Sequence, residues 1–312
     1  MNSNRRSKKG KVGRRLLIAS AVIAGTVVSV WAAAELNMAR ERADREYLGD
    51  QLYTEIRGSG DPVVFLAGLQ GTTRYWGHAF DALGSKYRLI FVDALGFGRS
   101  PWPRYSDYGL DVQLAALRRT LVAKGATTNV TIVAHSFGTI IAAAYASRFP
   151  DDVSRVVLLG TPIFANEQQA RERIRNMTRL GALFTFNRTL ANLTCLTMCA
   201  FRPVLRRVLP RLRPNLNPAV VADSVLHDLP SVDGSVNRIL LREKVEDSLQ
   251  RIGAKAVLIH GRTDAVTPIE DARRVAAETG ATLIEVPGDH QQYFENGVQT
   301  IEGAVKRTAV LP

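Results

Sequence analysis

Short apolar runs alternate with segments of mixed polarity along most of the chain. Six of these runs are rich in Val, Ile and Leu and show little apolar-polar alternation; they are Pro62–Leu69, Tyr87–Ala94, Asn129–His135, Val153–Gly160, Ala254–Gly261 and Ala281–Pro287. Runs of this kind are typical of strands that helices bury on both faces. We therefore predict six strands of a mostly parallel sheet.

Segments between these runs have apolar residues at helical spacing. Tyr108–Lys124 places leucines on one helical face, and Ile269–Thr279 does the same with Val275 and Ala276. A repeated order of strand, helix and strand predicts a doubly wound α/β fold.

The interval from Ile163 to Gly253 interrupts this order. Its length of about ninety residues far exceeds an ordinary connection between a helix and a strand. Glu167–Phe184 and Ser235–Ile252 are expected to be helical, and the prolines between them are expected to interrupt the middle. We predict that residues 163–253 form a helical cap, or lid, and that residues 50–162 and 254–312 form the core.

The N-terminus joins a basic segment to an apolar one. The first fifteen residues hold seven Arg or Lys and no acid, and Leu16–Ala34 carries no charge. The apolar region of a cleaved signal peptide has roughly 7 to 15 residues, whereas a bilayer span needs about 20. The length favours an uncleaved membrane anchor within residues 1–35, followed by a charged linker at residues 36–49.

Cleavage near Trp31–Ala34, which would release a secreted protein, is the alternative to an anchor. In both cases the positive-inside rule leaves the basic tail in the cytoplasm and places the rest of the chain on the extracytoplasmic side.

The net charge of +12 is unevenly distributed. The first fifteen residues carry +7 and residues 163–253 carry +6, so the remaining residues are nearly neutral. The chain has neither a basic face across the whole domain nor a nucleic-acid motif, and we expect no nucleic-acid partner. With 46% hydrophobic residues among 312, the chain can bury a full core.

The cysteines and histidines do not predict a metal site. Cys195 and Cys199 are too few for a disulfide scaffold, and the chain has no Cys/His cluster with zinc spacing. The two cysteines form either a local disulfide or, as we favour, two buried thiols in a helix.

Ser136 lies directly after a predicted strand and before a predicted helix, within the sequence TIVAHSFGTI at Thr131–Ile140. The small residues Ala134 and Gly138 flank it at two positions. This pattern resembles the nucleophile elbow G-x-S-x-G of the α/β-hydrolase family, in which a strained turn raises the serine hydroxyl above the sheet. The resemblance implies an α/β-hydrolase fold with an inserted lid, and a nucleophilic role for Ser136.

The resemblance also implies the partners of this serine. In the family the base lies in the loop after the last strand, which here contains His290, and Asp264 follows the preceding strand. The order Ser136, Asp264, His290 is the order of the family. A helix N-cap is the alternative role for Asp264.

Two further features match the family. The resemblance implies that the backbone N–H groups of Leu69 and Phe137 form the oxyanion hole, although this chain has Ala67-Gly68 where many relatives have His-Gly. Asp93–Ser100, DALGFGRS, resembles the D-x-x-G-x-G-x-S loop of the family. We interpret that loop as structural because its glycines permit tight backbone geometry.

These features together predict a serine hydrolase that acts on a carboxylic ester or a related, mostly apolar acyl substrate without a cofactor. Thioesters, lactones, amides, carbon–carbon bonds and haloperoxidase chemistry share the same triad and stay open. A serine nucleophile argues against dehalogenases and epoxide hydrolases, which use a carboxylate. The alternative from another class is a ligand-binding protein that keeps the fold without turnover.

The predicted cap contains a basic segment, Phe201–Pro214, in which arginines alternate with Leu, Val and Phe. A solvated basic face is the simplest interpretation. The alternatives are a site for an acidic substrate and a surface that rests on anionic lipid near the anchor.

Overall fold

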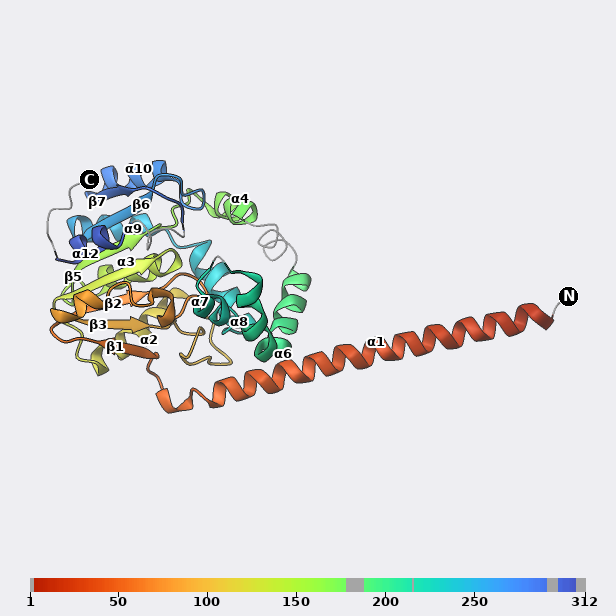
Figure 1. Cartoon of the computed structure of the whole chain (residues 1–312). Coiled ribbons are helices and arrows are strands. Elements are labelled where there is room, and N and C mark those ends of the chain that lie inside the picture. Colours follow the sequence, from red (N-terminus) through yellow and green to blue (C-terminus); the bar gives the residue numbers. More distant parts are fainter. Residues whose placement is uncertain (1–2, 178–187, 215, 291–296, 307–312) are drawn as a thin grey trace.

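The computed structural model describes residues 3–177, 188–214, 216–290 and 297–306 (Figure 1). Its centre is a seven-stranded sheet with the strand order β1-β3-β2-β4-β5-β6-β7. The strands are β1 (Thr54–Arg57), β2 (Asp61–Leu66), β3 (Tyr87–Val92), β4 (Val130–His135), β5 (Val153–Leu159), β6 (Ala256–Gly261) and β7 (Thr282–Val286). The six predicted strands are therefore confirmed, most of them slightly shorter than expected.

The strand β1 was not predicted. It is one of the two edge strands and, in the described sheet, the one antiparallel member, paired through Thr54 to Val92 of β3, whereas the other neighbouring strands run parallel. Its four residues, TEIR, are only partly buried, so they form no apolar run. A short, half-exposed edge strand of this kind lacks the pattern by which the buried strands are recognised.

Helices cover both faces of the sheet. One face packs against α2 (Leu110–Ala123), α3 (Phe137–Arg148), α9 (Val245–Ile252) and α10 (Ile269–Thr279). The other face packs against α12 (Val298–Lys306) and the short helices η2 (Thr73–Trp76) and η3 (Asp81–Ser85). Two apolar clusters result, one on each face of the strands, as a doubly wound sheet requires.

The insertion between β5 and β6 is helical. It contains α4 (Glu167–Met177), α6 (Arg188–Leu212), α7 (Pro218–Asp223), α8 (Leu229–Gly234) and the π-helical turn η4 (Ser235–Leu240). The expected helix Glu167–Phe184 is confirmed as far as Met177, and residues 178–184 lie outside the described part. The expected helix Ser235–Ile252 is interrupted before α9, which packs against α3 and α10.

The prediction that prolines interrupt the middle of the insertion was wrong at two positions. Pro203 and Pro210 both lie inside α6, a helix of 25 residues. Proline lacks an N–H, so Pro203 cannot bond to the carbonyl of Cys199 four residues earlier. The side-chain amide of Asn37 donates to that carbonyl at 3.1 Å and to the carbonyl of Ala200 at 2.8 Å. A partner from another helix thus satisfies the acceptor that Pro203 leaves free.

The N-terminal helix α1 (Ser3–Ala43) extends from the rest of the molecule, and only its C-terminal end contacts it, at α6 (Figure 1). The segment Ser20–Leu48 contains a stretch of 18 residues with a mean hydropathy of 1.5, of which 12% is buried, and by length and composition it could cross a membrane. Residues 36–43, which we predicted as linker, continue the helix because LNMARERA contains neither Gly nor Pro. The 3₁₀ helix η1 (Glu46–Leu48) follows.

Three buried histidines predict a loss of stability in mild acid. Burial lowers the pKa of His260 to about 4, of His227 to about 4 and of His135 to about 3. Between pH 6.5 and 4 these three side chains therefore bind protons in the unfolded chain but not in the folded chain, and their contribution to the free energy of unfolding falls as pH falls.

Urea unfolding at pH 7 and pH 5 measures this difference. We expect His260→Gln to reduce the difference in midpoint between the two pH values, and His78→Gln, which alters an exposed side chain, to leave it unchanged. If the difference in urea midpoint between the two pH values is the same in both variants, His260 does not contribute to it as predicted.

Candidate active site

Ser136 occupies a sharp turn between β4 and α3. Its φ of 49° and ψ of −121° lie in a region that non-glycine residues rarely adopt, at a cost of roughly 1–3 kcal/mol. Hydrogen bonds hold the turn: the Ser136 N–H donates to Leu159 of β5 at 2.8 Å, and Thr139 donates to the Ser136 carbonyl through both its N–H and its hydroxyl. The turn leaves the Ser136 side chain partly exposed at the end of the strand.

Close packing explains the glycine two residues after Ser136. A Cβ atom added at Gly138 would lie 2.5 Å from the carbonyl oxygen of Ala67 and 2.7 Å from that of Leu66. Both distances are far below van der Waals contact, so α3 reaches β2 this closely only because residue 138 has no side chain.

The structure brings Ser136, His290 and Asp264 together in one hydrogen-bonded row. The His290 Nε2 atom lies 3.0 Å from Ser136 Oγ, and His290 Nδ1 lies 2.8 Å from Asp264 Oδ2. An ionised carboxylate only accepts hydrogen bonds, so Nδ1 carries the ring proton and Nε2 is free to accept from the serine hydroxyl. The three residues follow β4, β7 and β6, whose carboxyl ends meet at one edge of the sheet.

Asp264 is fixed within its own loop. Its Oδ1 accepts from the N–H groups of Val266 and Thr267 at 2.8 and 2.9 Å, and its Oδ2 accepts from the Thr267 hydroxyl at 2.7 Å. Burial raises the pKa of Asp264, but the hydrogen bonds from His290 and Thr267 outweigh it, so the pKa is well below its ordinary value. The helix α10 begins only at Ile269, with Pro268 as its N-cap, so Asp264 is not the N-cap that we considered.

His135, which we predicted only as the end of a strand, makes hydrogen bonds that position the site. Its Nε2 donates to the carbonyl of His290 at 3.1 Å, and its Nδ1 accepts from the Tyr75 hydroxyl at 2.9 Å. Burial, together with the nearby His290, lowers the pKa of His135 to about 3, so the ring is neutral at physiological pH. The sequence hinted at this contact only through the position of His135, which ends a buried strand and directly precedes Ser136.

The two residues that we predicted for an oxyanion hole lie beside Ser136. Phe137 is the first residue of α3, and Leu69 follows β2 in a loop where a Cβ added at Gly68 would lie 3.3 Å from the Ser136 Cβ. Within the described residues, no acceptor pairs with the N–H of Leu69 or of Phe137. Two unpaired donors near a serine hydroxyl are what a developing oxyanion requires.

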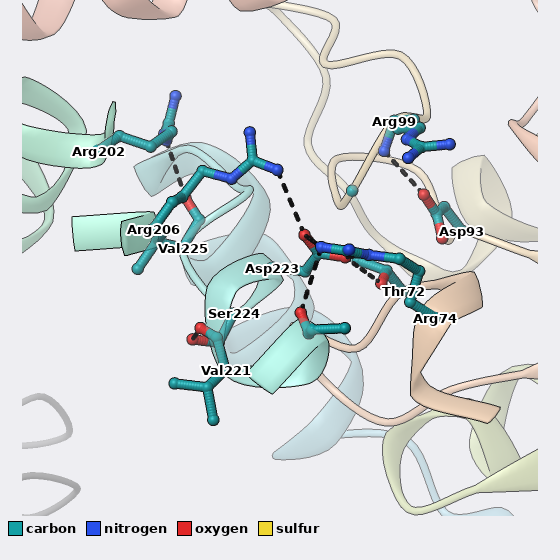
Figure 2. Close-up of polar contacts among 12 residues, drawn as sticks. Thr72, Arg74, Asp93, Arg99, Arg202, Arg206, Val221, Asp223, Ser224 and Val225 are labelled. Atoms are coloured by element: carbon teal, nitrogen blue, oxygen red, sulfur yellow. Dashed lines mark hydrogen bonds and ion pairs between the residues drawn. The ribbon is translucent and has the colours of Figure 1, made fainter. Parts of the chain in front are cut away.

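The inserted helices are bound to the loop that carries Leu69 (Figure 2). Asp223 of α7 accepts two hydrogen bonds from the Arg74 guanidinium, at 2.6 and 2.5 Å, and one from the Thr72 hydroxyl at 2.9 Å. Arg206 of α6 lies 3.5 Å from the same carboxylate. Asp223 is buried, so its charge needs these partners.

Two more contacts fix this loop. The Gln70 amide donates to the His227 Nε2 atom at 3.0 Å, which adds a second bond to the inserted helices. The Asp93 carboxylate accepts from the N–H of Arg99 at 2.8 Å (Figure 2) and from the N–H of Thr73 at 2.5 Å. These bonds agree with the structural role that we expected for Asp93–Ser100. The contacts of Asp223 and His227 left no signal in the sequence, because each joins residues about 150 positions apart.

Among the described residues, no group of three or more His, Cys, Asp or Glu is arranged to hold a metal ion. Cys195 and Cys199 are buried in α6 as free thiols.

Comparisons with known proteins agree with the fold. A family model for the alpha/beta hydrolase fold matches residues 61–297. A probable lysophospholipase of Arabidopsis thaliana, BODYGUARD 5, is 26% identical over 72% of this chain and 56% of its own length. Lipase 3 of a Moraxella species is 33% identical over 34% of this chain and 33% of its own. The chain thus spans little more than half of the plant relative.

Solved structures share the fold. An esterase from a Rhodococcus species, RhEst1, superposes with a TM-score of 0.62 at 21% identity, over 81% of this chain and 93% of its own. The enol-lactonase of Burkholderia xenovorans superposes with the same TM-score at 18% identity, over 82% of this chain and 96% of its own.

The close packing at Gly138 predicts a costly substitution. We expect Gly138→Ala to lower the free energy of unfolding by roughly 1–3 kcal/mol, because the added methyl group forces α3 away from β2. Chemical denaturation measures the change. Gly84→Ala is the matched control, since its Cβ meets no atom nearer than 3.7 Å. Equal free energies of unfolding of the two variants would show that the approach of α3 to β2 does not limit the size of the side chain at position 138.

Proposed function

Because the chain belongs to the α/β hydrolase fold family, we propose that it is a serine hydrolase that cleaves a carboxylic ester or a related acyl substrate. The observation that carries the proposal is the hydrogen-bonded row Asp264–His290–Ser136, with its serine on a strained turn. This arrangement supplies a nucleophile, a base and a group that orients the base, in reach of one another.

The geometry supports acyl transfer in two halves. His290 Nε2 takes the hydroxyl proton as Ser136 Oγ attacks the carbonyl carbon, and Asp264 stabilises the imidazolium that forms. The N–H groups of Leu69 and Phe137 donate to the oxyanion. His290 then gives its proton to the leaving alcohol, and a water molecule, activated by the same ring, releases the acid from the acyl-enzyme.

The names of the relatives support an apolar acyl substrate. They include a probable lysophospholipase, lipases and, among solved structures, esterases and an enol-lactonase. A haloalkane dehalogenase is also similar, at 36% identity over 38% of this chain, but Ser136 stands here at the nucleophile position. Lactones and thioesters fall within the proposal because the same triad attacks both.

We also propose that α1 anchors the protein in a membrane and that the remaining chain lies on the extracytoplasmic side. The apolar length of the segment and the basic residues before it support this orientation. Cleavage of the segment as a signal peptide is the competing outcome. We further propose that residues 163–253 act as a cap that selects the substrate of the core, whether or not the segment is cleaved.

Hydrolysis of p-nitrophenyl esters, from acetate to long acyl chains, tests the proposed activity on the full chain in detergent. We expect Ser136→Ala to lower kcat by about 10⁶-fold and Asp264→Asn by about 10⁴-fold, with little change in stability. Ser85→Ala, at an exposed serine far from the site, should retain full activity.

Labelling with a fluorophosphonate completes the test. Wild type should be labelled and Ser136→Ala should not. If neither protein turns over an ester and wild type is not labelled, the hydrolase proposal fails and the ligand-binding alternative replaces it.

A further inference from the structure

One face of α6 carries apolar side chains that the described part of the chain leaves uncovered. Each is between 39% and 66% exposed, and they are Leu193, Phe201, Val204, Val208 and Leu212. Their spacing of three, four or eight residues places them on one side of the helix. We call these five residues the apolar stripe. Its opposite side is buried, with Cys195 and Cys199 facing the rest of the molecule.

The helix α1 holds α6 at the point where its apolar segment ends. Ala34 and Met38 pack against Cys195 and Cys199, and Asn37 donates to two carbonyls of α6. Further toward the N-terminus, α1 exposes apolar side chains that have no cover in the described structure, among them Val27, Val28 and Trp31. The apolar stripe and the exposed part of α1 thus belong to neighbouring helices (Figure 1).

Two arginines fix the direction of α1 relative to the body. Arg42 pairs with the buried Asp228 at 3.0 Å. Arg45 is itself buried, donates to the carbonyl of Gly98 at 3.1 and 2.6 Å, and lies over the ring of Trp102 at 4.2 Å. Buried charged contacts of this kind are costly to break because each leaves a charge without its partner. These contacts hold the C-terminal end of α1 and the residues after it against the body.

The charge next to the apolar stripe is positive. Arg188–Leu212 contains no Asp or Glu, and the exposed Arg207 and Arg211 pair with no carboxylate among the described residues. An anionic membrane surface attracts such residues. Apolar side chains with basic neighbours are typical of helices that lie in the membrane interface.

We infer that α6 lies in the headgroup region of the bilayer that α1 crosses, with its apolar stripe toward the acyl chains and Arg207 and Arg211 on anionic headgroups. The inference rests on the proposed membrane anchor and is independent of the proposed chemistry. It assigns the uncovered face to a lipid bilayer rather than to solvent. The cap, which is bound to the Leu69 loop, is then held at the membrane surface.

Fluorescence quenching in vesicles tests the location of α6. The full chain with Val204→Cys, labelled with the environment-sensitive dye NBD, is inserted into phosphatidylcholine vesicles with and without phosphatidylglycerol. Val122→Cys on α2 is the matched control, because both valines are 55% exposed. Wild type gives the labelling background, since Cys195 and Cys199 are buried.

We expect lipids with a spin label near the headgroup to quench the dye at residue 204 but not at residue 122, and iodide in solution to quench only the latter. Arg207→Gln with Arg211→Gln should weaken quenching at residue 204 in vesicles that contain phosphatidylglycerol. Equal quenching by iodide at both positions would overturn the inference.

A contact between copies gives a different result. If energy transfer between labelled chains accompanies protection of residue 204, and persists in detergent without lipid, the apolar stripe is an interface between copies and the inference is wrong. Hydrolysis of p-nitrophenyl acetate by the same samples separates the two proposals, because absence of activity with lipid quenching at residue 204 would reject only the hydrolase.

Discussion

The close approach of α3 to β2 at Gly138 is the packing constraint on which the site depends. It forces the chain to turn within one residue, and Ser136 takes that turn with a positive φ. The hydroxyl is then presented at the end of β4, and the first N–H of α3 is left without a helical acceptor. The loops after β6 and β7 open at the same edge of the sheet and bring Asp264 and His290 to it.

Sequence patterns predicted the strands that form apolar runs, including the partly exposed β7, and missed the strand that does not. Strands such as β4, buried at every residue, form apolar runs that need no other information. The half-exposed strand β1 has no such run. The prolines of α6 were misinterpreted because the carbonyl that Pro203 leaves without a helical donor is satisfied by Asn37, a residue more than 160 positions away. The helical segment 36–43 was predicted as a linker because its contacts with α6, made by Asn37 and Met38, cannot be recognised in the sequence.

The candidate site was predictable to a similar extent. The resemblance to the α/β-hydrolase family, together with the order along the chain, selected Ser136, Asp264 and His290, and the structure brings these three into hydrogen-bond contact. The supporting residues were not predictable: His135 resembled any strand end, and Asp223 resembled any helical carboxylate. Their roles depend on which loops meet in space, and a single sequence does not encode that in local spacing.

The helix α1 is continuous from its apolar segment to the contact with α6, with no glycine or proline between Ala34 and Ala43 to act as a joint. A membrane helix adjusts to a thinner bilayer by tilting. With the chain anchored in a membrane as we propose, the contacts at Asn37, Arg42 and Arg45 would make the inserted helices turn with such a tilt, and these helices hold Thr72 and Arg74 beside Leu69. Bilayer thickness would thereby be transmitted, as a mechanical input, to the shape of the candidate active site.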